Sequence, residues 1–456
     1  MQVTLSIEQQ RAFDLFKEGK NLFITGPGGC GKSTLIREMV HYMEANDTKF
    51  QVCAMTGCAA VLLKCKARTL HSWAGIGLAT GTQKKIIDKT ITNNKLAKVW
   101  KTTRVLIVDE VSMMSKKIFD IIESIARMFR QKYHLPFGGM QVIFCGDFYQ
   151  LPPVGNMDDE DSCKFCFESE RWNVIFPRQQ HILLSQLFRQ QGDETFQHIL
   201  NQIRVGSLDS NNLEILKKYV LRPYETDIAP VQIFPTRAKV DYINRIMYEN
   251  IKDTEYTFDF EISKNATTYI DNGNPISIET FMHCESIDSE IMNNEIDYLI
   301  NNSNRIKRLS LKVGTKVMCL QNINVEAGIC NGSIGVVLRF ECGLNHPDKF
   351  YPVVKFTNGI EMLIAPQIIQ SESIPILVVS QIPLLKAWAL TIHKIQGTTL
   401  DIAEMDIGSQ IFEDGQIYVG LSRVKSLNGL YIKEFDPLKI KVNQKVKKFY
   451  QSLEIK

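Results

Sequence analysis

The stretch that decides the fold is Asn21–Ser33, which reads NLFITGPGGCGKS. Asn21–Thr25 is apolar and predicts a short strand, and a pattern with helical spacing follows the loop. Gly26–Ser33 fits the pattern GxxxxGK followed by Ser or Thr, in which glycines let backbone N–H groups curl around phosphate oxygens. Such a loop brings Lys32 to the β- and γ-phosphates and the Ser33 hydroxyl to Mg²⁺. The order of strand, glycine loop and helix therefore predicts a nucleotide site.

Further apolar stretches alternate with helical patterns in the first third of the chain. Phe50–Thr56, Val105–Asp109 and Gln141–Gly146 predict three more strands. Strands that alternate with helices form crossover units, so residues 1–155 are predicted to fold as α/β structure around a parallel sheet.

The predicted strand Val105–Asp109 ends in two carboxylates, Asp109 and Glu110. Open α/β sheets bind their ligands at the carboxyl ends of the strands. There Asp109 is expected to hold the Mg²⁺ shell, and Glu110 to polarise an attacking water as a general base. A cation between two carboxylates offsets their repulsion, so both stay ionised. These elements indicate a P-loop ATPase or GTPase.

The rest of the chain changes character twice. A second α/β region begins near Ile182, with helices expected over 193–205 and 238–251 and a strand over 230–234. Residues 155–171 are acidic and irregular and predict a surface loop. From Leu309 onward, short strands with Asn-Gly turns predict a small β-barrel, and the α/β pattern resumes after Pro375.

Composition bounds the class of protein. The 456 residues carry 53 basic and 50 acidic side chains, a net charge of +3, so a surface that binds nucleic acid must be a local groove. No stretch has the 18 or more apolar residues of a membrane span, and the N-terminus does not resemble a secretory signal. An intracellular, soluble protein is expected. Of 11 cysteines, Cys163 and Cys166 form a CxxC pair without a second pair nearby, which disfavours a structural zinc site.

Later segments resemble the motifs of superfamily 1 helicases. Gly146–Val154, GDFYQLPPV, resembles motif III. The other segments that carry the resemblance are Ser6–Gln9 (Q motif), Thr56–Ala60 and Thr69–Gly77 (motifs Ia and Ib), Leu187–Gln190 (motif IV), Phe234–Arg237, Thr391–Gly397 (motif V) and Tyr418–Arg423 (motif VI). With Ser124–Arg127 and Pro136–Gly139, they resemble the Pif (petite integration frequency) family of DNA helicases, kin to RecD in branch B of superfamily 1. The resemblance runs from about residue 5 to 435.

The resemblance implies a role for each group of residues. Arg189 and Arg423 are expected to act as arginine fingers, each worth roughly 10³–10⁵ in rate, and Gln150 to sense the γ-phosphate. The catalytic set is then Lys32, Asp109, Glu110, Gln150, Arg189 and Arg423, with Ser33 and Asp109 on Mg²⁺. The ATP-binding set is Gln9, Gly26, Pro27, Gly28, Gly29, Cys30, Gly31, Lys32, Ser33 and Thr34. The DNA-contacting set is Thr56, Thr69, His71, Thr391, His393 and Lys394.

The resemblance also implies an architecture. We expect an α/β fold of two RecA-like P-loop lobes with parallel sheets, plus a small β-barrel like that of Src-homology-3 domains inserted in the second lobe. The expected boundaries are 1–185 for the first lobe, 186–255 and 376–456 for the two parts of the second lobe, and 256–375 for the inserted domain.

The implied activity is ATP-dependent unwinding of duplex DNA by a monomeric motor that moves 5′ to 3′ on single strands. ATP and Mg²⁺ are the implied cofactors, single-stranded and forked DNA the partners, and replication, repair, recombination or telomere maintenance the setting. Usage of Ile, Asn and Lys hints at an AT-rich, viral genome. Three alternatives stay open: a translocase that does not unwind, a non-motor P-loop enzyme such as a nucleotide kinase, and a structural DNA-binding protein with an inactive ATPase site.

Overall fold

The computed structural model divides the chain into two compact units, residues 1–223 with 392–456 and residues 224–391. It describes residues 4–63, 65, 67–77, 79–156, 158–225, 229–263, 270–271, 274–275, 282, 284, 286–302, 307–324, 326–329, 331–343, 346–371, 374 and 376–454. Each unit is considered by itself, and the four-part division expected from the sequence stays a prediction.

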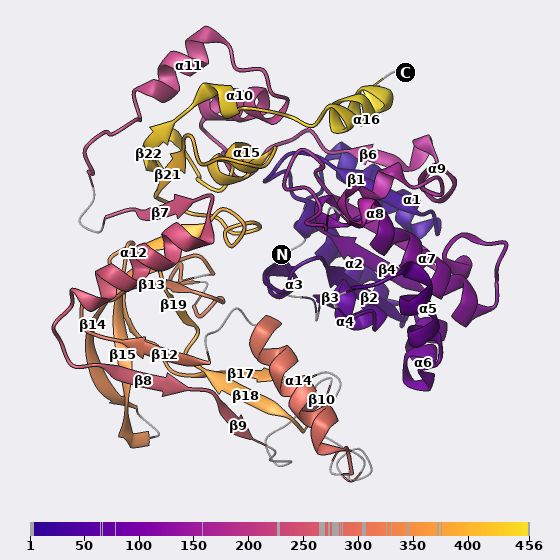
Figure 1. The fold of residues 1–456 in the computed structure, drawn as a ribbon, viewed down its shortest axis with the longest axis horizontal. Coiled ribbons are helices and arrows are strands. Elements are labelled where there is room, and N and C mark those ends of the chain that lie inside the picture. The colour runs from indigo at the N-terminus through magenta and orange to yellow at the C-terminus, as the bar shows by residue number, and fades with distance from the viewer. Residues whose placement is uncertain are drawn as a thin grey trace. The chain divides into compact units, whose positions relative to one another are not determined.

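The first unit is built on a parallel sheet of six strands in the order β3-β2-β4-β5-β1-β6 (Figure 1). Its strands are β1 (Leu22–Thr25), β2 (Phe50–Ala54), β3 (Arg68–Thr69), β4 (Val105–Asp109), β5 (Gln141–Gly146) and β6 (His181–Leu183). The four strands predicted between residues 21 and 146 are thus confirmed, because apolar runs bounded by helices are buried on both sheet faces.

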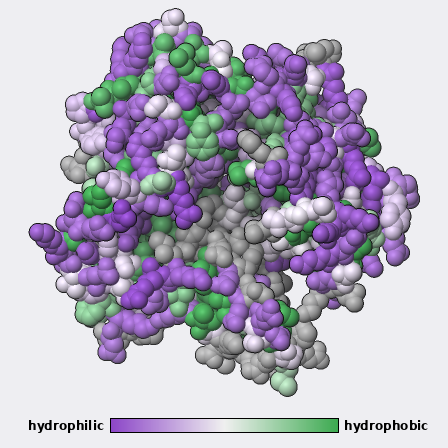
Figure 2. Space-filling view, in the orientation of Figure 1, coloured by the Kyte–Doolittle hydropathy of each residue, from purple (hydrophilic) through white to green (hydrophobic). Residues whose placement is uncertain are grey.

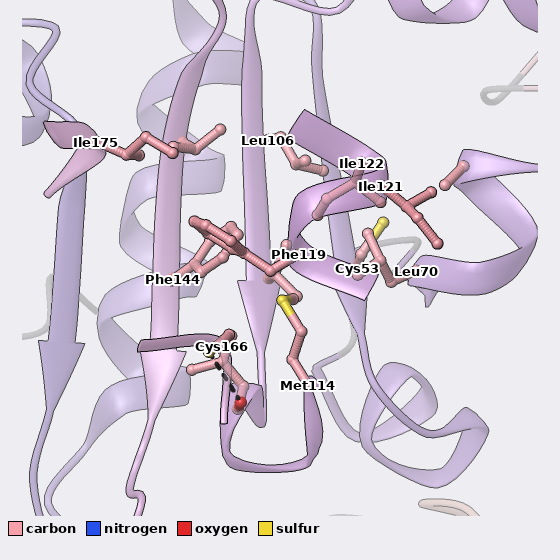
Figure 3. Packing of buried hydrophobic residues seen from close by; sticks show 14 of the residues in the cluster. Cys53, Leu70, Leu106, Met114, Phe119, Ile121, Ile122, Phe144, Cys166 and Ile175 are labelled. Carbon is pink, nitrogen blue, oxygen red and sulfur yellow. Dashed lines mark hydrogen bonds between the residues drawn. The ribbon is translucent and has the colours of Figure 1, made fainter. Parts of the chain in front are cut away.

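Helices cover both faces of this sheet. They are α1 (Ile7–Lys17), α2 (Lys32–Ala45), α3 (Gly57–Leu63), α4 (Leu70–Ala74), α5 (Gln83–Ile91), α6 (Asn94–Thr102), α7 (Lys116–Arg130), α8 (Glu160–Cys163) and α9 (Trp172–Ile175). Alternation along β1 separates two cores: Leu22 and Ile24 pack with α1 and α2, whereas Phe23 packs with α7 and α9 on the other face. Figure 3 shows the second core, where Phe119 of α7 lies edge-on to Phe144 of β5 at 5.9 Å between ring centroids.

The surface loop predicted over residues 155–171 is wrong in its second half. Phe165 and Cys166 are buried, and the Cys166 thiol donates to the Val111 carbonyl at 3.7 Å (Figure 3). Lys116 and Lys164 both pair with Asp161, at 2.7 and 3.1 Å, which offsets the acidity that suggested a solvated loop. Trp73 is a core residue, and its ring is tilted by 44° against that of Trp100, with 4.3 Å between the ring centroids.

The first unit continues through α10 (Glu194–Arg204) and α11 (Ser210–Lys217), then resumes after residue 391 with β21 (Ala403–Ile407), α15 (Gln416–Leu421), β22 (Leu430–Phe435) and α16 (Gln444–Glu454). β21 and β22 pair in parallel, and Val220 forms a bridge to Ile432 of β22. The helix predicted over 193–205 is confirmed as α10, which begins one residue later and ends one residue earlier.

The second unit contains mostly antiparallel strands. β7 (Val231–Phe234) pairs in parallel with β20 (Ala389–Thr391), and α12 (Arg237–Glu249) follows β7. A five-stranded antiparallel sheet has the order β16-β15-β14-β13-β19, formed by β13 (Lys316–Cys319), β14 (Ile334–Gly343), β15 (His346–Phe356), β16 (Glu361–Leu363) and β19 (Leu384–Lys386). The remaining elements are β8 (Tyr256–Asp259), β9 (Glu261–Ser263), β10 (Ile270–Asp271), β11 (Asn274–Pro275), α14 (Ser289–Asn302), β12 (Arg308–Leu311), β17 (Gln367–Gln370) and β18 (Val378–Gln381).

On the face drawn in Figure 2, the described residues present mostly hydrophilic side chains, with hydrophobic ones scattered among them. Among the described helices, none combines the length and the apolar character that a membrane span requires.

Candidate functional site

The glycine loop leaves β1 and enters α2 with a backbone that suits glycine. Gly29 and Gly31 have φ of 88° and 84°, in the left-handed region, and Gly31 is the N-cap of α2. A Cβ at Gly29 would lie 2.6 Å from Cβ of Arg189, so neighbouring chain approaches the loop closely. The Lys32 ammonium donates to the carbonyls of Gly26 at 2.6 Å and Pro27 at 3.0 Å. The lysine is thereby held over the loop whose helix N-terminus attracts anions.

The two carboxylates lie at the carboxyl end of β4, as predicted. Asp109 is buried, and burial together with the charge of Glu110 raises the pKa of Asp109 to about 7. Glu110 has a left-handed backbone with φ of 56°, and its N–H donates to the Asp109 carboxylate at 2.9 Å. The Gln396 amide donates to the Glu110 carboxylate at 3.1 Å. Glu110 is thus oriented by Gln396, which lies three residues after His393 in the segment that resembles motif V.

This donor set fits a hard divalent cation. Hydroxyl and carboxylate oxygens are the ligands Mg²⁺ prefers, and Ser33 and Asp109 supply one of each near Lys32. Burial and, after it, the charge of Glu110 raise the pKa of Asp109, and a cation bound there would favour the charged carboxylate.

Two guanidinium groups lie against the same loop. A Cβ at Gly28 would lie 3.1 Å from Nη2 of Arg423 and 3.5 Å from Nη1 of Arg189. Arg189 donates to the Ser422 carbonyl at 2.9 Å, and Arg423 donates to the Val419 carbonyl at 3.0 Å. Desolvation and the neighbouring Arg423 lower the pKa of Arg189 to about 9. Two desolvated like charges beside a glycine loop form a site that an anion would stabilise.

Gln9, another predicted nucleotide residue, lies in the first turn of α1, and its side chain reaches Gly31 at the start of α2. Its side chain accepts from the Ser6 N–H at 2.9 Å in a capping box and donates to the Gly31 carbonyl at 3.3 Å. The Phe188 ring also approaches Gly31, 3.3 Å from where a Cβ would stand, and is 39% exposed. Phe188 therefore offers a flat apolar surface beside Gln9.

Gln150 is buried, and its Oε1 has no hydrogen-bond partner among the described residues. An unpaired buried acceptor is costly, so it points to a contact made by a ligand or a moving group. Gln150 lines a cavity of about 580 Å³ together with Pro152, Pro153 and His393. The cavity brings a predicted nucleotide sensor and a predicted DNA contact to one place.

The predicted DNA-contacting residues are divided between the two units. Thr56 and Thr69 cap α3 and α4, accepting from Ala59 N–H at 3.2 Å and Ser72 N–H at 3.4 Å, while His71 is half-buried and burial lowers its pKa. His393 is half-buried and Lys394 exposed in the same unit, but Thr391 ends β20 in the other unit.

Sequence reasoning gave no role to three residues that the structure brings to the site. Gln396 contacts Glu110, Phe188 contacts the loop, and the Tyr418 hydroxyl accepts from the Gly28 N–H at 2.8 Å. All three lie inside segments that carried the helicase resemblance, so the motifs marked their positions without their contacts.

Comparison with known proteins identifies the family. A model of the PIF1-like helicase family matches residues 4–214, and one of the DNA helicase Pif1 2B domain matches 299–340. ATP-dependent DNA helicase RRM3 of Saccharomyces cerevisiae is 31% identical, covering 99% of this chain and 68% of that protein. ATP-dependent DNA helicase PIF1 of Emericella nidulans is 33% identical, and the match covers 96% of this chain and 61% of that protein. The uncharacterized protein 030L of Invertebrate iridescent virus 6 is 30% identical, covering 99% and 94%.

Solved structures agree. The Pif1 helicase of Candida albicans is 31% identical with a TM-score of 0.74, covering 99% of this chain and 100% of that one. Bacteroides Pif1 in complex with ADP-AlF4 is 26% identical with a TM-score of 0.73, covering 99% and 97%. A structure titled for DNA unwinding at forked duplexes by two coordinating Pif1 helicases is 26% identical with a TM-score of 0.62, and the match covers 99% of this chain and 97% of that one. The chain spans about two thirds of the length of the RRM3 and PIF1 relatives. This chain belongs to the PIF1-like helicase family.

Proposed function

We propose that the chain is an ATP-dependent DNA helicase that hydrolyses ATP to move along a single strand and separate duplex DNA. The observation that carries the proposal is the meeting of Lys32, Arg189 and Arg423 at one glycine loop. Glu110 follows β4, which is separated from β1 by β5 in the same parallel sheet. The relatives' names and the ADP-AlF4 and forked-DNA titles support it.

Each residue has a chemical task in this proposal. The loop amides and Lys32 bind the phosphates, and Gln9 with Phe188 holds the adenine. Glu110, oriented by Gln396, accepts the proton of the attacking water, while Arg189 and Arg423 stabilise the charge that develops on the transferred phosphoryl group. Ser33 and Asp109 would hold Mg²⁺, which supplies further neutralisation of phosphate charge when bound. Gln150 senses the γ-phosphate, and it lines the same cavity as His393, one of the proposed DNA contacts.

For DNA, we propose that Thr56, Thr69, His71, Thr391, His393 and Lys394 grip the strand, mainly through its phosphates. Because these contacts go mainly to the backbone, binding depends on salt but little on sequence, with a log–log slope of about −0.7 per neutralised phosphate on single strands. A flat salt response, or a strong preference for one sequence, would contradict this part.

The finer parts of the proposal concern architecture and direction. We propose that residues 1–185 form the first lobe, that 186–255 and 376–456 form the second, and that 256–375 form the inserted domain. In this proposal its strands β13, β14, β15 and β16 curl into the small barrel, with β19 from beyond residue 375 at the edge of the same sheet. The motor works as a monomer inside the cell and moves 5′ to 3′; the viral relative makes a viral setting reasonable.

The test is ATP hydrolysis with and without single-stranded DNA. Strong stimulation is expected in the unsubstituted chain, no turnover in Lys32→Ala, and retained ATP binding without hydrolysis in Glu110→Gln. Unchanged turnover in Glu110→Gln would remove that residue as the base. Hydrolysis indifferent to DNA would favour the non-motor enzyme.

A further inference from the structure

The C-terminal helix α16 packs on the sheet of the first unit rather than trailing from β22 (Figure 1). Val446 and Tyr450 are buried in the core that also holds Phe23 of β1. Phe449 stacks on Phe167, with 4.4 Å between ring centroids, and lies edge-on to Phe148 at 5.4 Å. Segments about 300 residues apart in the chain thus share one core, at the point where motif III begins.

The Tyr450 hydroxyl is a junction between two parts of the ATP site. It donates to the Asp147 carboxylate at 3.2 Å, accepts from the Phe148 N–H at 3.1 Å, and lies 2.5 Å from the Thr25 hydroxyl. Thr25 is the last residue of β1 before the glycine loop, and Asp147 precedes Gln150 by three residues. One phenol therefore ties the start of the loop to the turn that carries the proposed γ-phosphate sensor.

Arg204 of α10 completes the junction. Its guanidinium binds the fully buried Asp147 carboxylate with two bonds of 2.8 Å. It also lies over the Tyr149 ring at 4.5 Å and the Tyr450 ring at 5.2 Å, and those two rings stack at 4.6 Å. Burial alone would lower the pKa of Arg204, but the Asp147 carboxylate outweighs it and the pKa of Arg204 is raised, so the guanidinium stays protonated.

The turn that Tyr450 and Arg204 hold also fixes Gln150 from its own side. The Asp147 carboxylate accepts from the Tyr149 N–H at 3.2 Å, and the Asp147 carbonyl accepts from the Gln150 N–H at 2.8 Å. The Gln150 side chain keeps an unpaired Oε1 in this arrangement. The sensor is thus aimed by the backbone of a turn whose anchor is Asp147.

We propose that Tyr450 is a positioning residue for ATP hydrolysis: with Arg204 it clamps Asp147, so that α16 sets the place of Gln150 relative to the glycine loop. The inference rests on the proposed ATPase function. It predicts that loss of the hydroxyl loosens the turn 147–150 and slows hydrolysis without weakening ATP binding, because the phenol touches neither the loop glycines nor Lys32 in any contact recorded for the described residues.

The test compares Tyr450→Phe with Tyr42→Phe in the full chain. Both remove one phenolic hydroxyl and keep the ring; Tyr42 packs edge-on to Phe13 and Phe16, far in sequence from motif III. In Tyr450→Phe the DNA-stimulated kcat should fall about tenfold while KM for ATP changes less than twofold, since a hydrogen bond to a charged group is lost. Tyr42→Phe should leave both unchanged. Equal kinetics in the two variants would overturn the proposal.

A second readout does not depend on activity. Amide hydrogen exchange of residues 147–151 should speed up in Tyr450→Phe and in Arg204→Lys, which keeps the charge but loses the paired bonds. The double variant should show exchange at residues 147–151 little faster than in either single variant, because both side chains act through Asp147. Unchanged exchange at 147–151, or a loss of folded protein with normal kcat in what remains, would reduce Tyr450 to a packing residue. If the unsubstituted chain hydrolyses no ATP, the proposed function fails, and the exchange measurement alone decides the clamp.

Discussion

Replacing Gln396 with Leu tests whether this side chain orients Glu110, the proposed general base, because the change should lower the rate of hydrolysis with little effect on the stability of the fold. The Gln396 amide gives Glu110 a hydrogen bond at 3.1 Å, while its Oε1 is buried without a partner among the described residues. Losing the bond to a carboxylate costs about 1.5–3 kcal/mol, and removing an unsatisfied buried acceptor returns about 1–3 kcal/mol. Because the two effects oppose each other, the free energy of unfolding should change by at most about 2 kcal/mol in either direction.

The rate should respond differently, because Glu110 must point at the attacking water. If the lost bond appears wholly in the transition state, about 1.5–3 kcal/mol corresponds to a fall in kcat of roughly 10- to 150-fold, with KM for ATP nearly unchanged. The assay is steady-state ATP hydrolysis at saturating single-stranded DNA, beside chemical denaturation of the same preparation.

A matched control is Gln10→Leu, since Gln10 also donates an amide hydrogen bond to a carboxylate, Asp14 at 2.9 Å, but at an exposed position on α1. It should leave kcat and stability unchanged. A Gln396→Leu variant that hydrolyses ATP as fast as the unsubstituted chain would refute the claim that this contact orients the base.

Three further predictions follow from single contacts. Gly29→Ala should abolish ATP binding in equilibrium titration, because its φ of 88° costs an alanine about 1–2 kcal/mol and its Cβ would collide with Arg189; tight binding would contradict it. Arg423→Lys should keep ATP affinity but lower kcat at least 100-fold, since an ammonium cannot retain both the Val419 and Ser422 contacts and reach the phosphate; a fall below threefold would exclude a finger. Burial lowers the pKa of His181 to about 4 from an ordinary value near 6.5, so the unfolded chain binds the proton first and stability falls as pH drops from 6.5 toward 4; His181→Phe should flatten that part of the curve, and an equally steep loss would contradict it.

Much of the local structure around the proposed nucleotide site was predictable from sequence, because short local patterns place its residues on the fold. An apolar strand directly precedes the glycine loop with Lys32, and another precedes Asp109–Glu110 at its carboxyl end. Their positions on the sheet therefore follow from local sequence, without knowledge of residues far away in the chain. The parallel sheet of the first unit followed for the same reason.

What sequence could not supply are contacts between segments far apart in the chain. Nothing in the pattern of residues 444–454 indicates that Tyr450 reaches Asp147, or that Gln396 reaches Glu110, because such pairs depend on packing. The second half of the acidic stretch 155–171 was mistaken for a solvated loop, because composition does not show that Lys116 and Lys164 pair with Asp161. The hydroxyls of Thr56 and Thr69, assigned to DNA, also cap helices, a local role that the same residue types fill.

The central claim is that ATP hydrolysis at this site drives strand separation from a 5′ tail. The most direct measurement is displacement of a labelled strand from partial duplexes that carry either a 5′ or a 3′ tail, at saturating ATP, with Glu110→Gln as the inactive control. Displacement is expected from the 5′-tailed substrate alone, and none with Glu110→Gln. Displacement from the 3′ tail alone would reverse the direction, and hydrolysis without displacement from either tail would contradict the helicase assignment and leave a translocase.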